Sequence, residues 1–384
     1  MHVAKRNGQS EDYNVEKIHQ VVQWATEDLN GVSLSDIEMN ANLSLYDGIP
    51  TSEIQQILIK SANDLISESN PNYQYSAARL LNMQLRKDVW ASGTKPPAFF
   101  DFIAVRVDNG VYDPAILEKW SKEDVEKLES YINHSRDDLF TYAGLQQLID
   151  KYLVKNRSTG EIFETPQFAY MLIAMCLFDD VAEVKKAYDA YSTFKINLPT
   201  PIMAGVRTTI KQFASCVLVD VEDDLDSIFS SLHAVGKYTA RRAGIGLNMG
   251  RIRPINAPIR GGEVIHTGII PYLKNFESAV KSTSQNGLRG GSATVHVPFW
   301  HYEIEDVLVL KNNAGTDDNR VRKLDYSIQF CKLFYERLVA NEDITLFNPN
   351  ETKGLYEAFG DNKKFEELYK KYENARSVKF KKKI

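Results

Sequence analysis

The spacing of apolar residues changes character once along this chain of 384 residues, at the proline-containing stretch 198–201. Residues 98–198 carry apolar side chains at helical spacing, with amphipathic runs at 113–132 and 166–191. Beyond the prolines, short apolar runs alternate with glycine-rich loops and helical segments, which is the pattern of an α/β region. The predicted strands include residues 216–219, 304–310 and 344–347.

The N-terminal segment predicts a compact unit of one hairpin and four helices. Residues 3–11 favour a hairpin, because an Asn-Gly dipeptide at their centre is a common two-residue turn. Three helices begin at candidate N-caps, and a fourth covers residues 73–90. The candidate caps are Asn14, Ser33 and Thr51. Residues 91–97 (ASGTKPP) break both helix and strand. We therefore expect three domains, at 1–92, 93–211 and 212–384.

Composition and charge limit the classes of partner. The formal net charge is -5, with 51 acidic against 46 basic residues, which argues against nucleic-acid binding by counterion release. Residues 1–10 lack the apolar core of a signal peptide, and we find no run of about 18 apolar residues that could span a membrane. The three cysteines lie far apart, which fits neither a disulfide framework nor a paired zinc site. We expect a cytoplasmic protein that binds no metal, membrane or nucleic acid.

Three glycine-rich segments of the α/β region are candidates for anion binding. Each combines an arginine with two or more glycines, at 242–246, 258–263 and 284–292. Successive backbone N–H groups beside a guanidinium form a cradle for an anion such as a phosphate. Ordinary turns remain the alternative for each segment. None continues as Gly-Lys-Ser/Thr, and 242–246 lacks a third glycine at Rossmann spacing, so neither a Walker A loop nor a dinucleotide fingerprint is predicted.

Lysines near the N-terminus and one cysteine are further candidates. Lys5 and Arg6 precede the predicted turn and Lys17 lies on the first helix, and such cations suit a triphosphate. Solvated surface lysines are the alternative. Cys216 lies at the start of a predicted strand among small residues. A free cysteine is more often a small buried hydrophobe than a reactive thiol, and this alternative applies more strongly to Cys176 and Cys331.

Seven motifs, in order along the chain, resemble those of the large subunit of class I ribonucleotide reductases. They are LPTPIM (198–203), FASC (213–216), RAGIG (242–246), PIRGGE (258–263), LRGG (288–291), LKNN (310–313) and EDITLF (342–347). The N-terminal unit is similar to the ATP cone of the same family. The resemblance implies an α/β fold with an N-terminal helical ATP cone, a helical domain and then the first half of a ten-stranded α/β barrel. It also implies the reduction of ribonucleoside diphosphates to deoxyribonucleotides.

The resemblance implies roles for particular residues. Cys216 would be one half of the redox pair that reduces the 2'-carbon of the substrate, since a thiol oxidised to a disulfide can be reduced again by exchange. The substrate site would be lined by Thr200, Ser215, Ala243 and Gly244, with Arg289 on the loop that relays effector identity. A deoxynucleotide at the specificity site would contact Asp223, Asp224, Leu225, Arg253, Ile259 and Arg260. The nucleotide-contacting positions of the cone match Lys5, Arg6, Glu11, Asn14, Lys17, Thr51 and Lys87.

The sequence also departs from the family pattern. Gln55 stands where relatives carry histidine, which argues against strong inhibition by dATP. The motif with the thiyl-radical cysteine, the redox partner of Cys216, the tyrosines that relay the radical and the C-terminal cysteine pair have no counterpart in these 384 residues. A half-barrel leaves a strand edge and an apolar face uncovered. The chain is therefore expected to be inactive alone.

The resemblance further implies the partners. They are a polypeptide with the C-terminal part of the large subunit, a small subunit bearing a diiron-tyrosyl radical, and thioredoxin or glutaredoxin. ATP and deoxynucleotides would be effectors, and no cofactor is expected in this chain. The alternative reading is a non-catalytic nucleotide-binding protein with a regulatory role.

Overall fold

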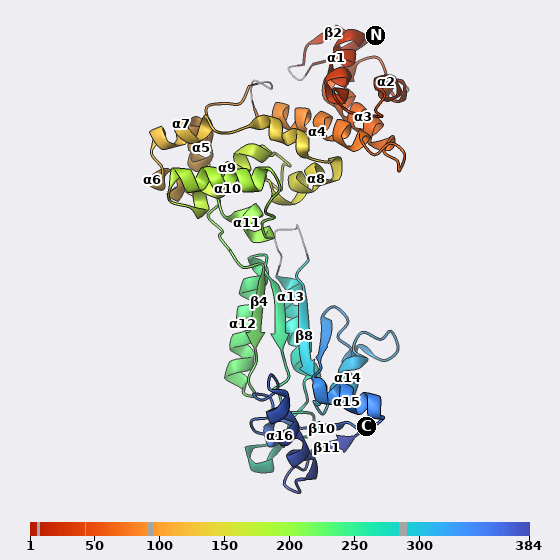
Figure 1. The fold of residues 1–384 in the computed structure, drawn as a ribbon, viewed down its shortest axis with the longest axis vertical. Helices are drawn as coiled ribbons and strands as arrows, with labels where there is room; N and C mark the ends of the chain where they lie inside the picture. Colours follow the sequence, from red (N-terminus) through yellow and green to blue (C-terminus); the bar gives the residue numbers. More distant parts are fainter. Residues whose placement is uncertain (6–7, 43, 91–94, 284–289) are drawn as a thin grey trace. The chain divides into compact units, whose positions relative to one another are not determined.

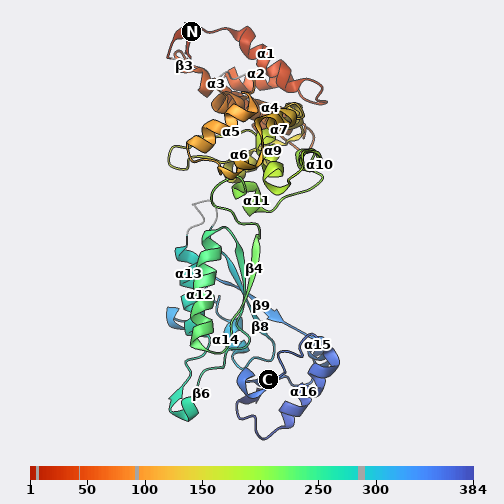
Figure 2. The same cartoon turned by 90° about the vertical axis from the view of Figure 1, so that its left-hand side faces the viewer.

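The computed structural model describes residues 1–5, 8–42, 44–90, 95–283 and 290–384. The chain folds into two compact units, Met1–Phe213 and Ala214–Ile384, each with its own hydrophobic clusters. Figure 1 and Figure 2 show the elements of both units. The first unit is mainly helical and the second contains a parallel sheet with helices, so the predicted change of architecture is confirmed.

The first unit begins with a small sheet followed by helices. Strand β1 (His2–Ala4) pairs antiparallel with β2 (Ser10–Asp12) and parallel with β3 (Ile49–Pro50). The antiparallel pair confirms the predicted hairpin, and Gly8 provides the positive φ of its turn (+80°). The helices are α1 (Val15–Thr26), α2 (Leu34–Asn42), α3 (Thr51–Asp64) and α4 (Tyr73–Val89). They enclose a core that includes Val22, Ile37, Leu58 and Leu80.

Two of the three predicted caps are confirmed. The side chain of Asn14 accepts the N–H of Glu16 at 2.9 Å, and Ser33 Oγ accepts the N–H of Asp36 at 3.2 Å. Thr51 is not a cap but the first residue of α3. Pro50 occupies the cap position with extended backbone and has no side-chain acceptor to offer. The prediction for Thr51 was wrong because β3 leads directly into the helix.

A second group of helices completes the first unit. These are α5 (Phe99–Asp108), α6 (Ala115–Lys119), α7 (Lys122–Glu129), the 3-10 helix η1 (His134–Leu139), α8 (Tyr142–Gln147), the π-helical turn η2 (Leu148–Tyr152), α9 (Pro166–Leu177), α10 (Val181–Ser192) and α11 (Thr200–Gly205). Asn82 and Arg86 of α4 both donate to the buried carboxylate of Asp137, which also accepts from Gln167 of α9. Charge-assisted bonds therefore tie α4 to the helices that follow it.

A four-stranded parallel sheet forms the centre of the second unit. Its strand order is β4 (Cys216–Asp220), β5 (Gly244–Asn248), β8 (Ala293–Pro298) and β9 (Asp325–Gln329). The connections run through α12 (Leu225–Ala240), α13 (Ile270–Ser282) and α14 (Ile304–Leu308). Figure 2 shows α12 and α13 side by side along the sheet. Apolar residues from alternate positions of the strands, such as Val217, Leu247 and Val295, belong to the core beneath them.

One predicted strand is a helix in the structure. Residues 304–310 contain α14, with Ile304 and Val307 buried three residues apart and acidic residues between them. This spacing is helical, but a short run that is mostly apolar is also compatible with a buried strand, and the prediction of a strand was therefore wrong. The other elements are β6 (Pro258–Ile259), η3 (Arg260–Gly262), β7 (Val264–Ile265), η4 (Asp317–Asn319), α15 (Lys332–Ala340), β10 (Thr345–Phe347), η5 (Pro349–Glu351), α16 (Asn362–Asn374) and β11 (Lys381–Lys383).

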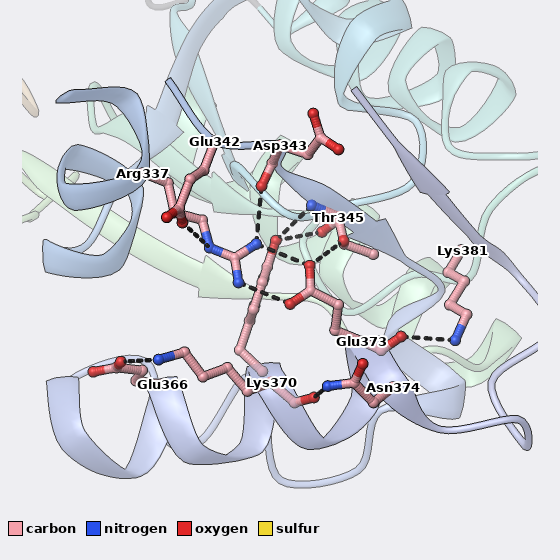
Figure 3. Close-up of polar contacts among 10 residues, drawn as sticks. Arg337, Glu342, Asp343, Thr345, Glu366, Lys370, Glu373, Asn374 and Lys381 are labelled. Carbon is pink, nitrogen blue, oxygen red and sulfur yellow. Dashed lines mark hydrogen bonds and ion pairs between the residues drawn. The ribbon is translucent and has the colours of Figure 1, made fainter. Parts of the chain in front are cut away.

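A polar cluster attaches α16 to α15 and β10. The guanidinium of Arg337 donates to both carboxylate oxygens of Glu373, at 2.8 and 2.7 Å (Figure 3). Tyr369 OH lies 2.7 Å from both the N–H and the carbonyl oxygen of Thr345. The Arg337 hydrogen bond is the main reason that the pKa of Glu373 is lowered. The bidentate geometry makes this pair a firm link between the two helices.

Candidate functional site

Six residues assigned by resemblance to the specificity site line one cavity. The cavity lies in the second unit and has a volume of about 320 Å³. The six are Asp223, Asp224, Leu225, Arg253, Ile259 and Arg260. They come from two stretches of chain some thirty residues apart, which the parallel sheet brings together at the end of β4 and β5. A cavity of this size, with apolar walls and a few charged groups, is typical of a small-molecule site.

Asp223 and Arg253 form the charged part of the cavity. The carboxylate of Asp223 accepts the backbone N–H of Arg253 at 3.0 Å and its Nε at 2.7 Å. It also accepts from Asn350 at 2.9 Å. The NH1 group of Arg253 donates to the carbonyl of Pro258 at 3.1 Å. A half-buried guanidinium held in this way is well placed to meet an anion.

The acidic pair has different local roles. Asp224 is the N-cap of α12, and its carboxylate accepts the N–H of Ser227 at 2.8 Å. Leu225 is the first residue of the helix and is exposed, as is Asp224.

Arg260 lies on the β6–β7 hairpin, where Arg260, Gly261 and Gly262 all have positive φ (+51°, +71° and +100°). Successive left-handed residues explain why this turn contains two glycines.

Four cavity residues were missed by the sequence analysis: Ile228, Val264, His266 and Tyr272. His266 and Tyr272 stack, with ring centroids 5.7 Å apart and planes 26° apart. Nδ1 of His266 accepts the N–H of Gly268 at 3.1 Å, and burial lowers the pKa of His266. Both rings lie outside the glycine-rich segments, and neither the spacing nor the composition of the sequence around them indicates a binding site. The cavity thus has a charged wall, with Asp223 and Arg253, and an aromatic wall, with His266 and Tyr272, a combination that suits a base attached to a phosphate.

The predicted redox cysteine is exposed at the start of β4. Cys216 lies in register with Gly244 of β5, and the N–H of Gly244 donates to the carbonyl of Ser215 at 2.7 Å. A Cβ on Gly244 would be in ordinary van der Waals contact with the carbonyl oxygen of Ser215 (3.7 Å) and with Ser292 Oγ (4.0 Å). Ala243 is fully buried. The alternative of a small buried hydrophobe is therefore wrong for Cys216, while Cys331 is buried and Cys176 half-buried.

The face of the sheet that carries Cys216 is mostly polar. Leu218, two residues along the strand, is 83% exposed. The same side of β5 and β8 presents Gly246, Asn248 and His296, which the strand register places side by side. This face is accessible in the described part of the chain. Of the other residues predicted for the substrate site, Thr200 opens α11 in the first unit, and Arg289 lies outside the described residues.

Four of the residues assigned to the cone site, Lys5, Glu11, Lys17 and Thr51, lie at the small sheet. Glu11 Oε1 lies 3.0 Å from Lys5 Nζ and 2.6 Å from Lys17 Nζ, and the hydrogen bond from Lys17, followed by that from Lys5, lowers the pKa of Glu11. Lys5 follows β1 and Thr51 follows β3, and these strands are parallel neighbours. Lys87 is exposed near the end of α4, and Arg6 lies outside the described residues.

Gln55 is turned into the core of the first unit. Its side chain is 6% exposed and donates to the carbonyl of Leu80 at 2.9 Å. The first unit also contains a cavity of about 360 Å³. It lies between α3, α4 and α8 and is lined by residues such as Lys60, Gln84 and Tyr142. The residues that the resemblance assigns to the cone site are not part of its lining.

The described residues contain neither a metal-binding cluster nor a membrane-spanning helix. Within residues 1–5, 8–42, 44–90, 95–283 and 290–384, no group of three His, Cys, Asp or Glu side chains is arranged to hold a metal ion. Over the same ranges, every helix is too short or too polar to cross a membrane.

Comparison with known proteins agrees with these features. The family model of the ribonucleotide reductase barrel domain matches residues 214–384, that of the ribonucleotide reductase all-alpha domain matches 138–211, and that of the ATP cone domain matches 1–88. The chain is 51% identical over 384 residues to the ribonucleoside-diphosphate reductase 1 subunit alpha of Escherichia coli, covering 98% of this chain and 50% of that protein.

Two other relatives give the same picture. The alpha subunit of Haemophilus influenzae is 50% identical over 98% of this chain and 51% of its own length, and that of Enterobacteria phage T4 is 46% identical over 99% and 51%. The chain thus spans about half the length of the curated relatives it matches. The three matching family models, in this order along the chain, and the sequence identity to these alpha subunits confirm the resemblance noted in the sequence. The chain belongs to the ribonucleotide reductase family and corresponds to the N-terminal part of its alpha subunits.

Proposed function

We propose that this chain is the N-terminal component of a ribonucleoside-diphosphate reductase. It would act with a polypeptide that supplies the C-terminal part of the large subunit and with a small subunit that bears a diiron-tyrosyl radical. The single observation that carries the proposal is the exposed thiol of Cys216 on an accessible, polar face of a parallel sheet. In this role the chain is inactive alone.

Cys216 supplies one of two thiols in the proposed reaction. Replacing the 2'-hydroxyl of a ribonucleotide by hydrogen, with loss of water, consumes two electrons and two protons. Oxidation of two thiols to a disulfide releases the same number. In this proposal the second thiol belongs to the C-terminal polypeptide, because neither Cys176 nor Cys331 matches the position of the redox partner in the family. Thioredoxin or glutaredoxin then reduces the disulfide by exchange.

The remaining predicted residues have binding roles in this proposal. Ser215 and Gly244, which lie beside the thiol, contribute to the substrate site, to which the resemblance also assigns Thr200, Ala243 and Arg289. The cavity with Asp223 and Arg253 binds a deoxynucleotide effector, whose phosphate meets the guanidinium and whose base lies near the aromatic pair. The cone binds ATP through Lys5, Lys17 and their neighbours.

The test is reconstitution. The chain is mixed with a polypeptide carrying the C-terminal half of an alpha subunit, a radical-bearing small subunit, thioredoxin with its reductase, and CDP. We expect dCDP only in the complete mixture, and none with Cys216→Ser. Cys331→Ser is the matched control and should retain turnover. When the reductant is omitted, non-reducing electrophoresis should show a cross-linked species that is missing with Cys216→Ser. Turnover by this chain with the small subunit alone would refute the proposal.

One observation favours a second function, a non-catalytic nucleotide-binding protein with a regulatory role. The ten described residues that line the cavity with Asp223 and Arg253 belong to this chain, which supports nucleotide binding there as a role separate from turnover. Deoxynucleotide binding with no turnover in any reconstituted mixture would support this second function over the first.

A further inference from the structure

The carboxyl group of Glu303 joins two backbone segments that border the effector cavity. Its Oε2 accepts the N–H of Ile255 at 3.2 Å and the N–H of Ile269 at 3.1 Å. Ile255 lies two residues after Arg253, and Ile269 immediately precedes α13, which carries Tyr272. Glu303 is only 3% exposed, so water cannot readily replace it as the acceptor of these two N–H groups.

His301 fixes the same segment from its other side. Its ring is fully buried, Nδ1 accepts the N–H of Glu303 at 3.1 Å, and Nε2 lies 2.8 Å from the carbonyl oxygen of Ile252. Because Nδ1 is an acceptor, Nε2 carries the proton and donates to that carbonyl. Burial lowers the pKa of His301 to about 4, which keeps the ring in this neutral form. The backbone on both sides of Arg253 is therefore held.

Gly268 makes room for the carboxyl group. Its φ is +85°, and an added Cβ would lie 2.4 Å from Oε1 of Glu303. The N–H of Gly268 in turn donates to His266, whose ring stacks on Tyr272. Glu303 thus contacts the backbone behind both walls of the cavity, although it is not part of the lining formed by the described residues.

We propose that Glu303 is a positioning residue for the deoxynucleotide site: it holds the segment carrying Arg253 against the start of α13 and so keeps Arg253 and Tyr272 in their places in the cavity lining. This role rests on the proposed function, because it takes the cavity as the effector site. Both N–H bonds end on one oxygen. A neutral amide oxygen in the same place can therefore accept both N–H bonds, whereas an apolar side chain of similar size cannot.

The experiment compares Glu303→Gln with Glu303→Met in the full chain. The affinity for dTTP is measured by calorimetry, and the affinity for ATP at the cone serves as the internal reference. We expect Glu303→Met to weaken dTTP binding by about tenfold or more, since two buried N–H groups lose their acceptor. Glu303→Gln should stay within about twofold of the unaltered chain. ATP affinity should not change in either variant, because the cone lies in the first unit, and circular dichroism of both variants checks that the second unit stays folded.

A second variant covers the case in which Glu303→Met does not fold. Glu303→Asp keeps the charge but is one methylene shorter, and it should weaken dTTP binding while Glu303→Gln does not. Unaltered dTTP affinity in the Met or the Asp variant would overturn the positioning role, as would equal losses in Gln and Met. If Arg253→Ala loses dTTP while Glu303→Met keeps it, only the positioning role fails. If the unaltered chain binds no dTTP, the proposed effector site fails with it.

Discussion

Asp223 accepts two hydrogen bonds from the same arginine, one from the backbone N–H of Arg253 at 3.0 Å and one from its Nε at 2.7 Å. The carboxylate therefore fixes both the backbone and the side chain of Arg253, which lines the cavity. This relationship links β4 to the loop after β5, and it is the basis of the first prediction.

Arg253→Ala should weaken dTTP binding by about ten- to a hundredfold, because a charge-assisted contact contributes about 1.5–3 kcal/mol. Arg251→Ala is the matched control. Arg251 pairs with Asp220 and Glu357 and is not part of the cavity lining, so dTTP affinity should be retained. Calorimetric titration of both variants decides the matter. Equal affinity in the unaltered chain and Arg253→Ala would contradict the assignment of the cavity.

Chemical modification should distinguish the three cysteines. Cys216 is exposed, whereas burial raises the pKa of the Cys176 thiol to about 11 and also raises that of Cys331. Since the thiolate is the reacting form, the folded chain should show one fast thiol with Ellman's reagent at neutral pH. That phase should vanish in Cys216→Ser and persist in Cys176→Ser. A fast phase that survives in Cys216→Ser would show that another cysteine is accessible.

The two glycines of the LRGG motif should respond differently to alanine. A Cβ on Gly291 would lie 2.2 Å from the carbonyl oxygen of Val280 and 2.7 Å from Thr239 Cγ2, whereas a Cβ on Gly290 meets nothing within 4 Å. Gly291→Ala should lower the free energy of unfolding by about 1–3 kcal/mol, the usual cost of overpacking. Gly290→Ala, measured by urea denaturation in parallel, should change it far less. Similar losses in both variants would rule out the close approach as the reason for Gly291.

Glu303 should make stability depend on pH in a definite direction. Burial, opposed by the N–H bonds from Ile269 and Ile255, raises the pKa of Glu303 from 4.5 to about 7, with Asp306 raising and Lys382 lowering it. Between these two values the folded chain binds this proton more tightly than the unfolded chain, so the contribution to the free energy of unfolding falls as pH rises. The full change is at most about 3 kcal/mol.

The measurement is urea denaturation of the unaltered chain and Glu303→Gln from pH 5 to about pH 8. The difference between them isolates Glu303 from other groups such as His301, whose lowered pKa acts in the opposite direction. Glu303→Gln should gain stability relative to the unaltered chain as pH rises. A difference that does not vary with pH would mean that the carboxyl group stays in one protonation state.

Lys5→Ala should weaken ATP binding by the cone by about tenfold, since it removes one cation from the cluster around Glu11. Lys60→Ala is the control, because Lys60 is exposed on α3 and is not one of the predicted cone residues. With Gln55 buried against Leu80, we also expect weak inhibition of reconstituted turnover by dATP. Strong dATP inhibition that Lys5→Ala abolishes would contradict this role of Gln55.

Local features of the fold could be predicted from the sequence because they depend on a few neighbouring residues. The caps at Asn14 and Ser33, the hairpin around Gly8 and the strand that starts at Cys216 all follow from side-chain acceptors, turn geometry and periodicity. The two errors are of the same local kind. Thr51 was predicted as an N-cap, but Pro50 occupies the cap position, and α14 was predicted as a strand because its residues are mostly apolar.

The sequence by itself determined the family, the order of the domains and the residues that the motifs single out. Only the tertiary structure placed Asp223 and Arg253 in one cavity, stacked His266 on Tyr272, and put Glu303 behind both walls. The physical reason is distance along the chain. Periodicity and capping act within one or two turns, whereas a cavity depends on which strands pair and on which side chains pack between them. These contacts join residues about thirty to fifty positions apart.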